Sequence, residues 1–234
     1  SDTVRFELAE AIARFMTATP IAGVVGGPIS GVLLQMDGVA GLGGWQWLFL
    51  IEGLPAVILG FVTLSVLPDG PRDARWLTAD EKEWIAARLS REREEVRRHG
   101  HHTLRAALGS RRVWTLAVIY FAVIMSFYGI SLWLPQIVQA FSGMSDVMVG
   151  FVSAVPYVAA TVGMVIIGKN SDRTRERRWH VAISAFTAAA GLIAAALLKT
   201  PGAELAALAL AAVGIWGTLG PFWAMSSEIL SGTG

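Results

Sequence analysis

Apolar residues gather in six long blocks along the chain, and one long polar run separates the first two blocks from the last four. The blocks cover residues 15–34, 45–67, 113–134, 147–167, 181–198 and 205–225. A helix that crosses the hydrocarbon core of a bilayer, about 30 Å thick, needs about 20 predominantly apolar residues. The pattern therefore predicts six transmembrane helices. The turns between the later helices are expected at Pro135, Ser142, Gly143, Pro201 and Gly202.

The composition indicates an all-α integral membrane protein. Apolar residues make up 54% of the 234 residues, charged residues only 16%, and the mean hydropathy is +0.54; an average soluble domain has about 25% charged residues. The absence of cysteine excludes a disulfide framework and thiolate metal sites. The chain begins with Ser1, and no signal peptide with a small-residue cleavage site opens it, so we expect a piece of a longer protein.

The polar run, residues 68–112, contains eleven Lys or Arg and eight Asp or Glu residues. Within it, Thr78 and Glu81 have the spacing of a capping box, which predicts that a helix begins there. Apolar residues at 84, 85, 89 and 96 form a stripe between arginines, so we expect this helix to lie along an anionic membrane surface rather than on nucleic acid. His99, His101 and His102 are expected in a solvated loop, because no partner carboxylate or thiolate has metal-ligand spacing.

The basic residues predict which side of the membrane each loop faces. If the polar run is cytoplasmic and there are six crossings, then residues 1–14, residues 168–180 and the C-terminal tail share its side. Those segments hold 18 of the 19 Lys and Arg residues, and only Lys199 lies on the other side. Cytoplasmic loops near membrane spans collect Lys and Arg. We therefore expect a multi-pass protein whose N-terminus and central loop are cytoplasmic.

Three glycines in the first block, Gly23, Gly27 and Gly31, recur at intervals of four and so share one face of a helix. Without side chains there, the backbone of a second helix can approach closely. Glycine is also simply common in membrane helices, but three in register favour a helix-packing face.

A motif follows the fourth block, where residues 168–178 read Gly-Lys-Asn-Ser-Asp-Arg-Thr-Arg-Glu-Arg-Arg. It resembles the conserved loop between the second and third helices of each half in the major facilitator superfamily. The positions that match are Gly168, Asp172, Arg173 and Arg177. Arg175 stands where that loop usually has glycine, which makes a left-handed turn less favourable. An Asp172 carboxylate beside an arginine or a helix N-terminus could hold two helices in one conformation. The simpler reading is a plain cytoplasmic basic loop.

Other stretches narrow the resemblance to the anion:cation symporter group, especially tartrate and sugar-acid permeases. They are residues 44–55, the polar residues 68–84 and residues 131–135. The resemblance implies a partial fold that covers helices five to ten of twelve. Residues 1–67 would then end the N-terminal half, residues 68–112 form the central cytoplasmic loop, and residues 113–234 begin the C-terminal half.

That group implies a secondary transporter in a bacterial inner membrane that moves a small organic anion with a proton or a sodium ion, by alternating access between two halves. It implies no cofactor and no nucleic-acid partner. The first block also partly matches the Gly-Pro signature of drug/proton antiporters, except that Val32 replaces its final glycine, so drug efflux is the alternative function. A further alternative is a truncated product without transport activity of its own.

Candidate site residues are few within the spans. Tyr120, Tyr128 and Tyr157 combine an apolar ring with a hydroxyl and can line a substrate pathway, although each can equally be a core tyrosine. Trp216 and Gln136 are weaker candidates. Glu52 is a carboxyl inside an apolar span, where an ionisable group is costly; it can carry a proton, pair with an arginine or support the backbone. An enzyme is not expected, because no catalytic pair and no metal-ligand set lies within the spans.

Overall fold

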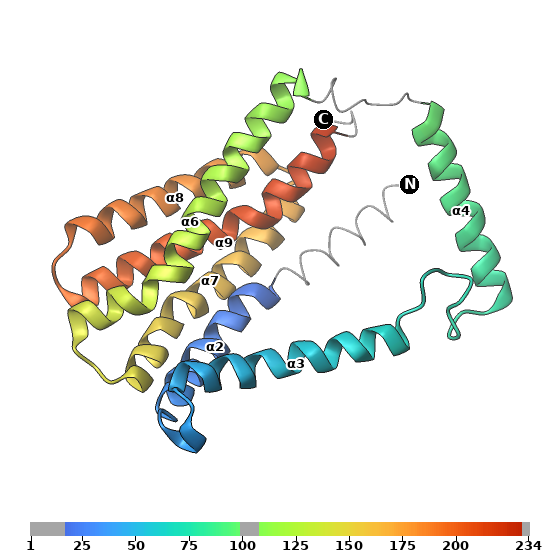
Figure 1. The fold of residues 1–234 in the computed structure, drawn as a ribbon. Helices are drawn as coiled ribbons and strands as arrows, with labels where there is room; N and C mark the ends of the chain where they lie inside the picture. Colours follow the sequence, from blue (N-terminus) through green and yellow to red (C-terminus); the bar gives the residue numbers. More distant parts are fainter. Residues whose placement is uncertain (1–16, 99–107, 231–234) are drawn as a thin grey trace. The chain divides into compact units, whose positions relative to one another are not determined.

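The structure is a computed structural model that describes residues 17–98 and 108–230. Over these residues every regular element is a helix (Figure 1). In chain order the elements are α2 (Ala18–Leu34), the 3-10 helix η1 (Val39–Gly41), α3 (Gly44–Val66), α4 (Ala79–Arg98), α6 (Arg111–Ser142), α7 (Asp146–Thr174), α8 (Arg177–Leu197) and α9 (Pro201–Leu230). The all-α fold predicted from the sequence is confirmed.

Over the described residues, each of the six apolar blocks coincides with a helix. Within the described residues, α3, α6, α7, α8 and α9 are long and apolar enough to cross a membrane, and α2 is a shorter apolar helix of 17 residues. Residues 15 and 16 of the first predicted block lie outside the described part. The structure therefore agrees with a membrane protein of about the predicted number of spans.

Three predicted boundaries were wrong. Pro201 and Gly202 were expected in a turn but are the first two residues of α9. Pro135 was expected in a turn but lies inside α6, which continues for 32 residues to Ser142. A proline is tolerated inside a membrane helix because neighbouring groups can satisfy the freed backbone. The expected loop at residues 168–180 is mostly helical, since α7 continues to Thr174 and α8 begins at Arg177. A helix does not end where the hydrocarbon ends, so polar residues can extend it into water.

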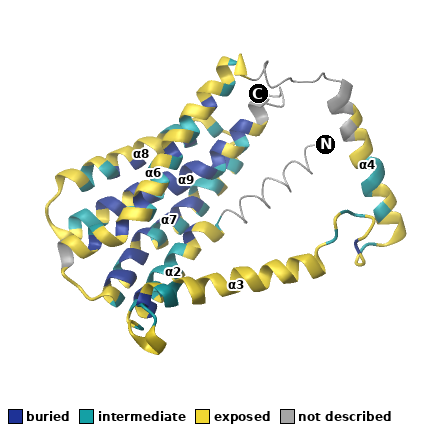
Figure 2. Ribbon diagram, viewed as in Figure 1, coloured by how far each residue is buried: buried dark blue, intermediate teal, exposed yellow. Residues whose placement is uncertain are grey.

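The chain divides into two compact units, and each is described by itself. The first comprises residues 1–45 and 115–234, whose described helices are α2, most of α6, and α7 to α9. Helix α9 supplies much of its core, with Ala211, Ala212, Ile215 and Trp216 almost fully buried (Figure 2). Small residues bring helices together here: a Cβ added to Gly191 or Gly214 would collide with the facing backbone of α9 or α8. Such close contacts between helix backbones are typical of membrane helix bundles.

The second unit, residues 46–114, contains α3 and α4. Every residue of α3 from Phe49 to Val66 is exposed, so this apolar helix needs lipid or further protein around it. Helix α4 begins with the predicted capping box: the Thr78 amide donates to Glu81 Oε2 at 2.8 Å, and the Glu81 amide donates to Thr78 Oγ1 at 3.4 Å. The hydrogen bonds from the Thr78 amide and hydroxyl lower the pKa of Glu81. Trp84 is exposed, with the Arg88 guanidinium 5.2 Å from its ring centre.

Candidate functional site

The glycine face of α2 lies against α7. A Cβ added to Gly23 would come within 2.6 Å of the Tyr157 ring, one on Gly27 within 2.8 Å of the Gly150 carbonyl oxygen, and one on Gly31 within 2.6 Å of the Asp146 carbonyl oxygen. Real Cβ atoms do not approach so closely. The spacing of four residues thus places all three glycines where α7 comes nearest.

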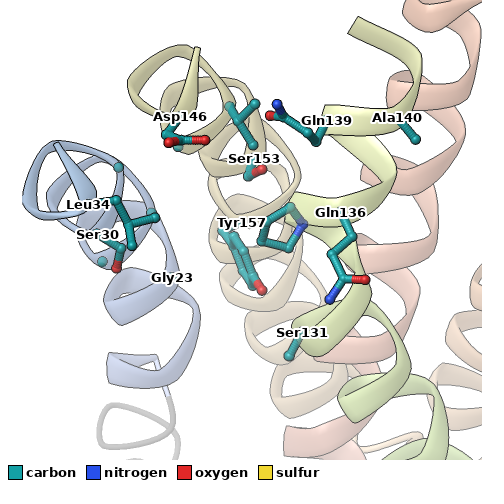
Figure 3. A pocket seen from close by; sticks show the side chains of 16 residues that line it. Gly23, Ser30, Leu34, Ser131, Gln136, Gln139, Ala140, Asp146, Ser153 and Tyr157 are labelled. Carbon is teal, nitrogen blue, oxygen red and sulfur yellow. The ribbon is translucent and has the colours of Figure 1, made fainter. Parts of the chain in front are cut away.

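A cavity of about 680 Å³ lies between α2, α6 and α7 (Figure 3). Its polar lining residues are Ser30, Ser131, Gln136, Gln139, Asp146, Ser153 and Tyr157. The rest of the lining is small or apolar, mainly the glycines of α2 with Leu34, Pro135, Ala140 and Val149. Among the described residues that line the cavity there is no Lys, Arg or His. The cavity therefore offers hydroxyls, amides and one carboxylate.

Tyr157 links this cavity to the core. Its ring meets Trp216 of α9 edge to face, with centroids 5.5 Å apart and planes at 86°. Trp216 is 1% exposed and also contacts Phe127, with ring centroids 4.8 Å apart. Ser131 of α6 lines the same cavity as Tyr157 (Figure 3). Trp216 does not line the cavity itself but supports the residue that does.

The other two tyrosines lie elsewhere. Tyr120 stacks on Phe222, with ring centroids 5.5 Å apart and planes at 16°, and meets Trp223 at its edge. Tyr128 is exposed and contacts Phe127 edge to face. Neither lines the cavity between α2, α6 and α7. The sequence made the three tyrosines equal candidates for the substrate pathway. Of the three, Tyr157 alone lines this cavity.

Ser153 is a cavity residue that sequence reasoning missed. It is 2% exposed, and its Oγ has no hydrogen-bond partner within the described chain. A single serine in an apolar block carries no signal in the sequence. Ser131 belongs to residues 131–135, one of the stretches on which the family resemblance rests, but the sequence predicted no role for it. Gln139 donates to the Met144 carbonyl at 3.1 Å across the end of α6.

The motif between α7 and α8 forms a compact turn. Arg177 donates to Asp172 Oδ1 at 2.6 Å and to Ser171 Oγ at 3.0 Å; the Arg177 side chain is 12% exposed and that of Asp172 39%. Arg175 adopts the left-handed conformation, with φ 55° and ψ 17°, that the family's glycine would take without strain. A Cβ on Gly168 would meet open space, and Arg173 is exposed. The ion pair fastens the end of α7 to the start of α8.

Glu52 lies inside α3 on an exposed surface of the described chain, three residues before Pro55. Over the residues that the structure describes, no group of three or more His, Asp or Glu side chains could hold a metal ion. His99, His101 and His102 lie outside the described residues.

The comparisons with known proteins agree with this architecture. The model of the Major Facilitator Superfamily matches residues 1–234. The chain is 44% identical over 220 residues to a putative tartrate transporter of Agrobacterium vitis, covering 94% of this chain and 49% of the relative. It is 39% identical to the inner membrane transport protein RhmT of Escherichia coli, covering 94% of this chain and 50% of the relative. It is 38% identical to a quinolone resistance transporter of Acinetobacter baumannii, covering 93% and 50%. The chain thus spans about half the length of these relatives.

Proposed function

Because the chain belongs to the major facilitator superfamily, we propose that the whole protein carries small hydroxylated organic anions, such as tartrate or sugar acids, across a membrane by alternating access. The relatives of this chain are transporters, and transport changes no covalent bond in the solute, so we assign no catalytic residue. A proton or a sodium ion drives the uptake. Two proteins of Agrobacterium vitis named putative tartrate transporter, 44% and 42% identical to this chain, support this choice of substrate.

The observation that carries the proposal is the lining of the cavity between α2, α6 and α7. Hydroxyl and amide groups there can donate and accept hydrogen bonds, which suits a solute rich in hydroxyls. The carboxylates of such a solute also need a cation or several converging donors. We infer from the resemblance to permeases that such basic residues lie on helices of the whole protein outside residues 1–234. Both parts together form the site in this proposal.

The proposal includes a division into halves and an orientation. Residues 1–67 complete an N-terminal half, residues 68–112 form a cytoplasmic loop that carries α4, and residues 113–234 begin a C-terminal half. The excess of Lys and Arg supports a cytoplasmic position for the loop and for the turn at Arg175. A bacterial inner membrane fits these relatives.

Drug efflux is the second candidate. The 38% identity to a quinolone resistance transporter and the partial Gly-Pro signature in α2 favour it. A drug antiporter would export a bulky, largely apolar solute. The cavity is lined by small and apolar residues as well as polar ones. Its lining therefore suits either kind of solute, and transport measurements distinguish the two functions.

The test is solute uptake by the whole protein in proteoliposomes. We expect labelled tartrate to accumulate when an inward proton or sodium gradient is imposed, and quinolones neither to move nor to compete. The 234-residue chain alone, reconstituted in the same way, serves as the control and should not accumulate tartrate, because six helices do not enclose a pathway between two halves. Quinolone export without carboxylate uptake would replace the proposal by its alternative.

A further inference from the structure

We propose that Ser153 and Tyr157 of α7, with Ser131 of α6, form a subsite that recognises an alcohol hydroxyl of the transported anion. This inference rests on the proposed function and deepens it, because it assigns a part of the substrate to particular side chains. The subsite forms one wall of the cavity between α2, α6 and α7.

The Ser153 hydroxyl is in an unusual state. Hydroxyls inside a helix usually bond the carbonyl four residues back, as Thr161 does to Tyr157 and Thr218 does to Gly214, both at 2.8 Å. Ser153 makes no such bond within the described chain, although it is 2% exposed. A buried polar group without a partner is costly and calls for an explanation. For a hydroxyl in the lining of a binding cavity, the explanation is that a bound ligand completes its hydrogen bonds.

Tyr157 is held in place by its neighbours. It lies one helical turn after Ser153, so both side chains project from the same face of α7. Its ring contacts Trp216 on one side, and the absence of a side chain at Gly23 leaves room for it on the other. The Tyr157 side chain therefore has a fixed position in the cavity lining, to which Ser131 also belongs (Figure 3). Fixed groups bind with a smaller loss of conformational entropy than mobile ones.

The hydroxyls of this wall match the chemistry of a substrate hydroxyl. Serine and tyrosine hydroxyls both donate and accept, as an alcohol hydroxyl of a substrate does. A carboxylate would need a cation, and the described lining has none, while Asp146 adds a negative charge at one end of α7. The wall thus suits the uncharged part of a hydroxy acid. A site built to hydrogen-bond a hydroxyl rejects an analogue that lacks it more strongly than an apolar pocket rejects a small change.

The test compares three four-carbon dicarboxylates that differ in hydroxyl number: tartrate with two, malate with one and succinate with none. The whole protein in proteoliposomes should prefer them in that order. Ser153→Ala should reduce the preference for tartrate over succinate by about five- to tenfold, which corresponds to one ordinary hydrogen bond. Tyr157→Phe keeps the ring on Trp216 and should act in the same direction. Ser126→Ala is the matched control, because its hydroxyl bonds the Ala122 carbonyl at 3.0 Å and lies outside the cavity.

The outcomes separate the two proposals. If the unaltered protein takes up no carboxylate, the proposed function is wrong. If it takes up tartrate but Ser153→Ala and Tyr157→Phe leave the tartrate-to-succinate ratio unchanged, the function stands and the hydroxyl subsite is wrong. A loss of uptake that is equal for all three solutes counts against the subsite as well, since a merely structural defect would not change selectivity.

Discussion

Gly27 of α2 and Gly150 of α7 meet backbone to backbone: a Cβ added to Gly27 would lie 2.8 Å from the Gly150 carbonyl oxygen, and one added to Gly150 would collide with the Gly27 carbonyl. Lipid tails are as apolar as leucine, so helices in a bilayer associate through close packing rather than through exclusion of water. The contact between these two glycines is therefore a direct source of stability for the first unit.

Replacing Gly27 by alanine should destabilise the protein by about 1–3 kcal/mol, because the added methyl group forces the helices apart. Gly26→Ala is the control on the same helix, since its Cβ would meet nothing within 4 Å. Alanine also favours a helix over glycine, so the control should be neutral or slightly stabilising. Thermal unfolding of the purified whole protein in detergent measures both. Equal stability of the two variants would contradict the importance of the contact.

Arg175→Gly should stabilise the protein by about 1 kcal/mol, because glycine adopts a positive φ without the steric cost that a side chain carries. The adjacent Glu176 has an ordinary φ of −102°. Glu176→Gly should therefore be destabilising, since it only adds freedom to the unfolded chain. Unfolding temperatures of the two variants and the parent protein check this pair. A lower stability of Arg175→Gly than of the parent would show that the arginine makes contacts worth more than the strain.

The helices were predictable from the sequence because membrane spans of this chain are long, apolar and separated by polar residues. Their ends were not. Helix α7 continues through Lys169, Asn170 and Asp172, whose polarity suggested a loop, because a helix that leaves the bilayer can stay helical in water. Pro135 suggested a turn for the same kind of local reason, and α6 continues past it.

The site was only partly predictable. The interval of four between Gly23, Gly27 and Gly31 indicated a packing face, but no pattern in the sequence states which helix meets it. That partner decides which tyrosine matters, since Tyr157 lies against Gly23 whereas Tyr120 and Tyr128 lie on α6, away from the cavity. Ser153 depends on the same packing. Its lack of a partner is a property of the folded bundle and not of any local motif.

The proposed orientation predicts the labelling of single cysteines, which is simple to interpret because the chain has no cysteine of its own. A cysteine at Lys199 should react with a membrane-impermeant thiol reagent in intact cells. Cysteines at Arg91 and Arg178, which are exposed, should react only after the membrane is opened. Arg178 is a better probe than Arg177, whose side chain is 12% exposed and pairs with Asp172. Labelling of residues 91 and 178 in intact cells would reverse the orientation.

Glu52→Gln distinguishes the roles left open for this carboxyl. Glu52 lies eight residues into α3, on a helix whose exposed apolar surface must face lipid or other helices of the whole protein. A carboxylate in such a place is costly unless a cation or hydrogen-bond donors meet it, and removing its charge then leaves the partner unpaired. We expect Glu52→Gln to reduce the amount of folded protein in the membrane, while uptake driven by a proton gradient persists in each remaining molecule. Glu204→Gln, in the first turn of α9 where water is near, is the control and should change neither quantity. Quantitative immunoblotting of the membranes and proteoliposome uptake measure the two effects separately. Normal protein level with loss of proton-driven uptake, but with exchange of solute retained, would instead make Glu52 the group that carries the coupling proton.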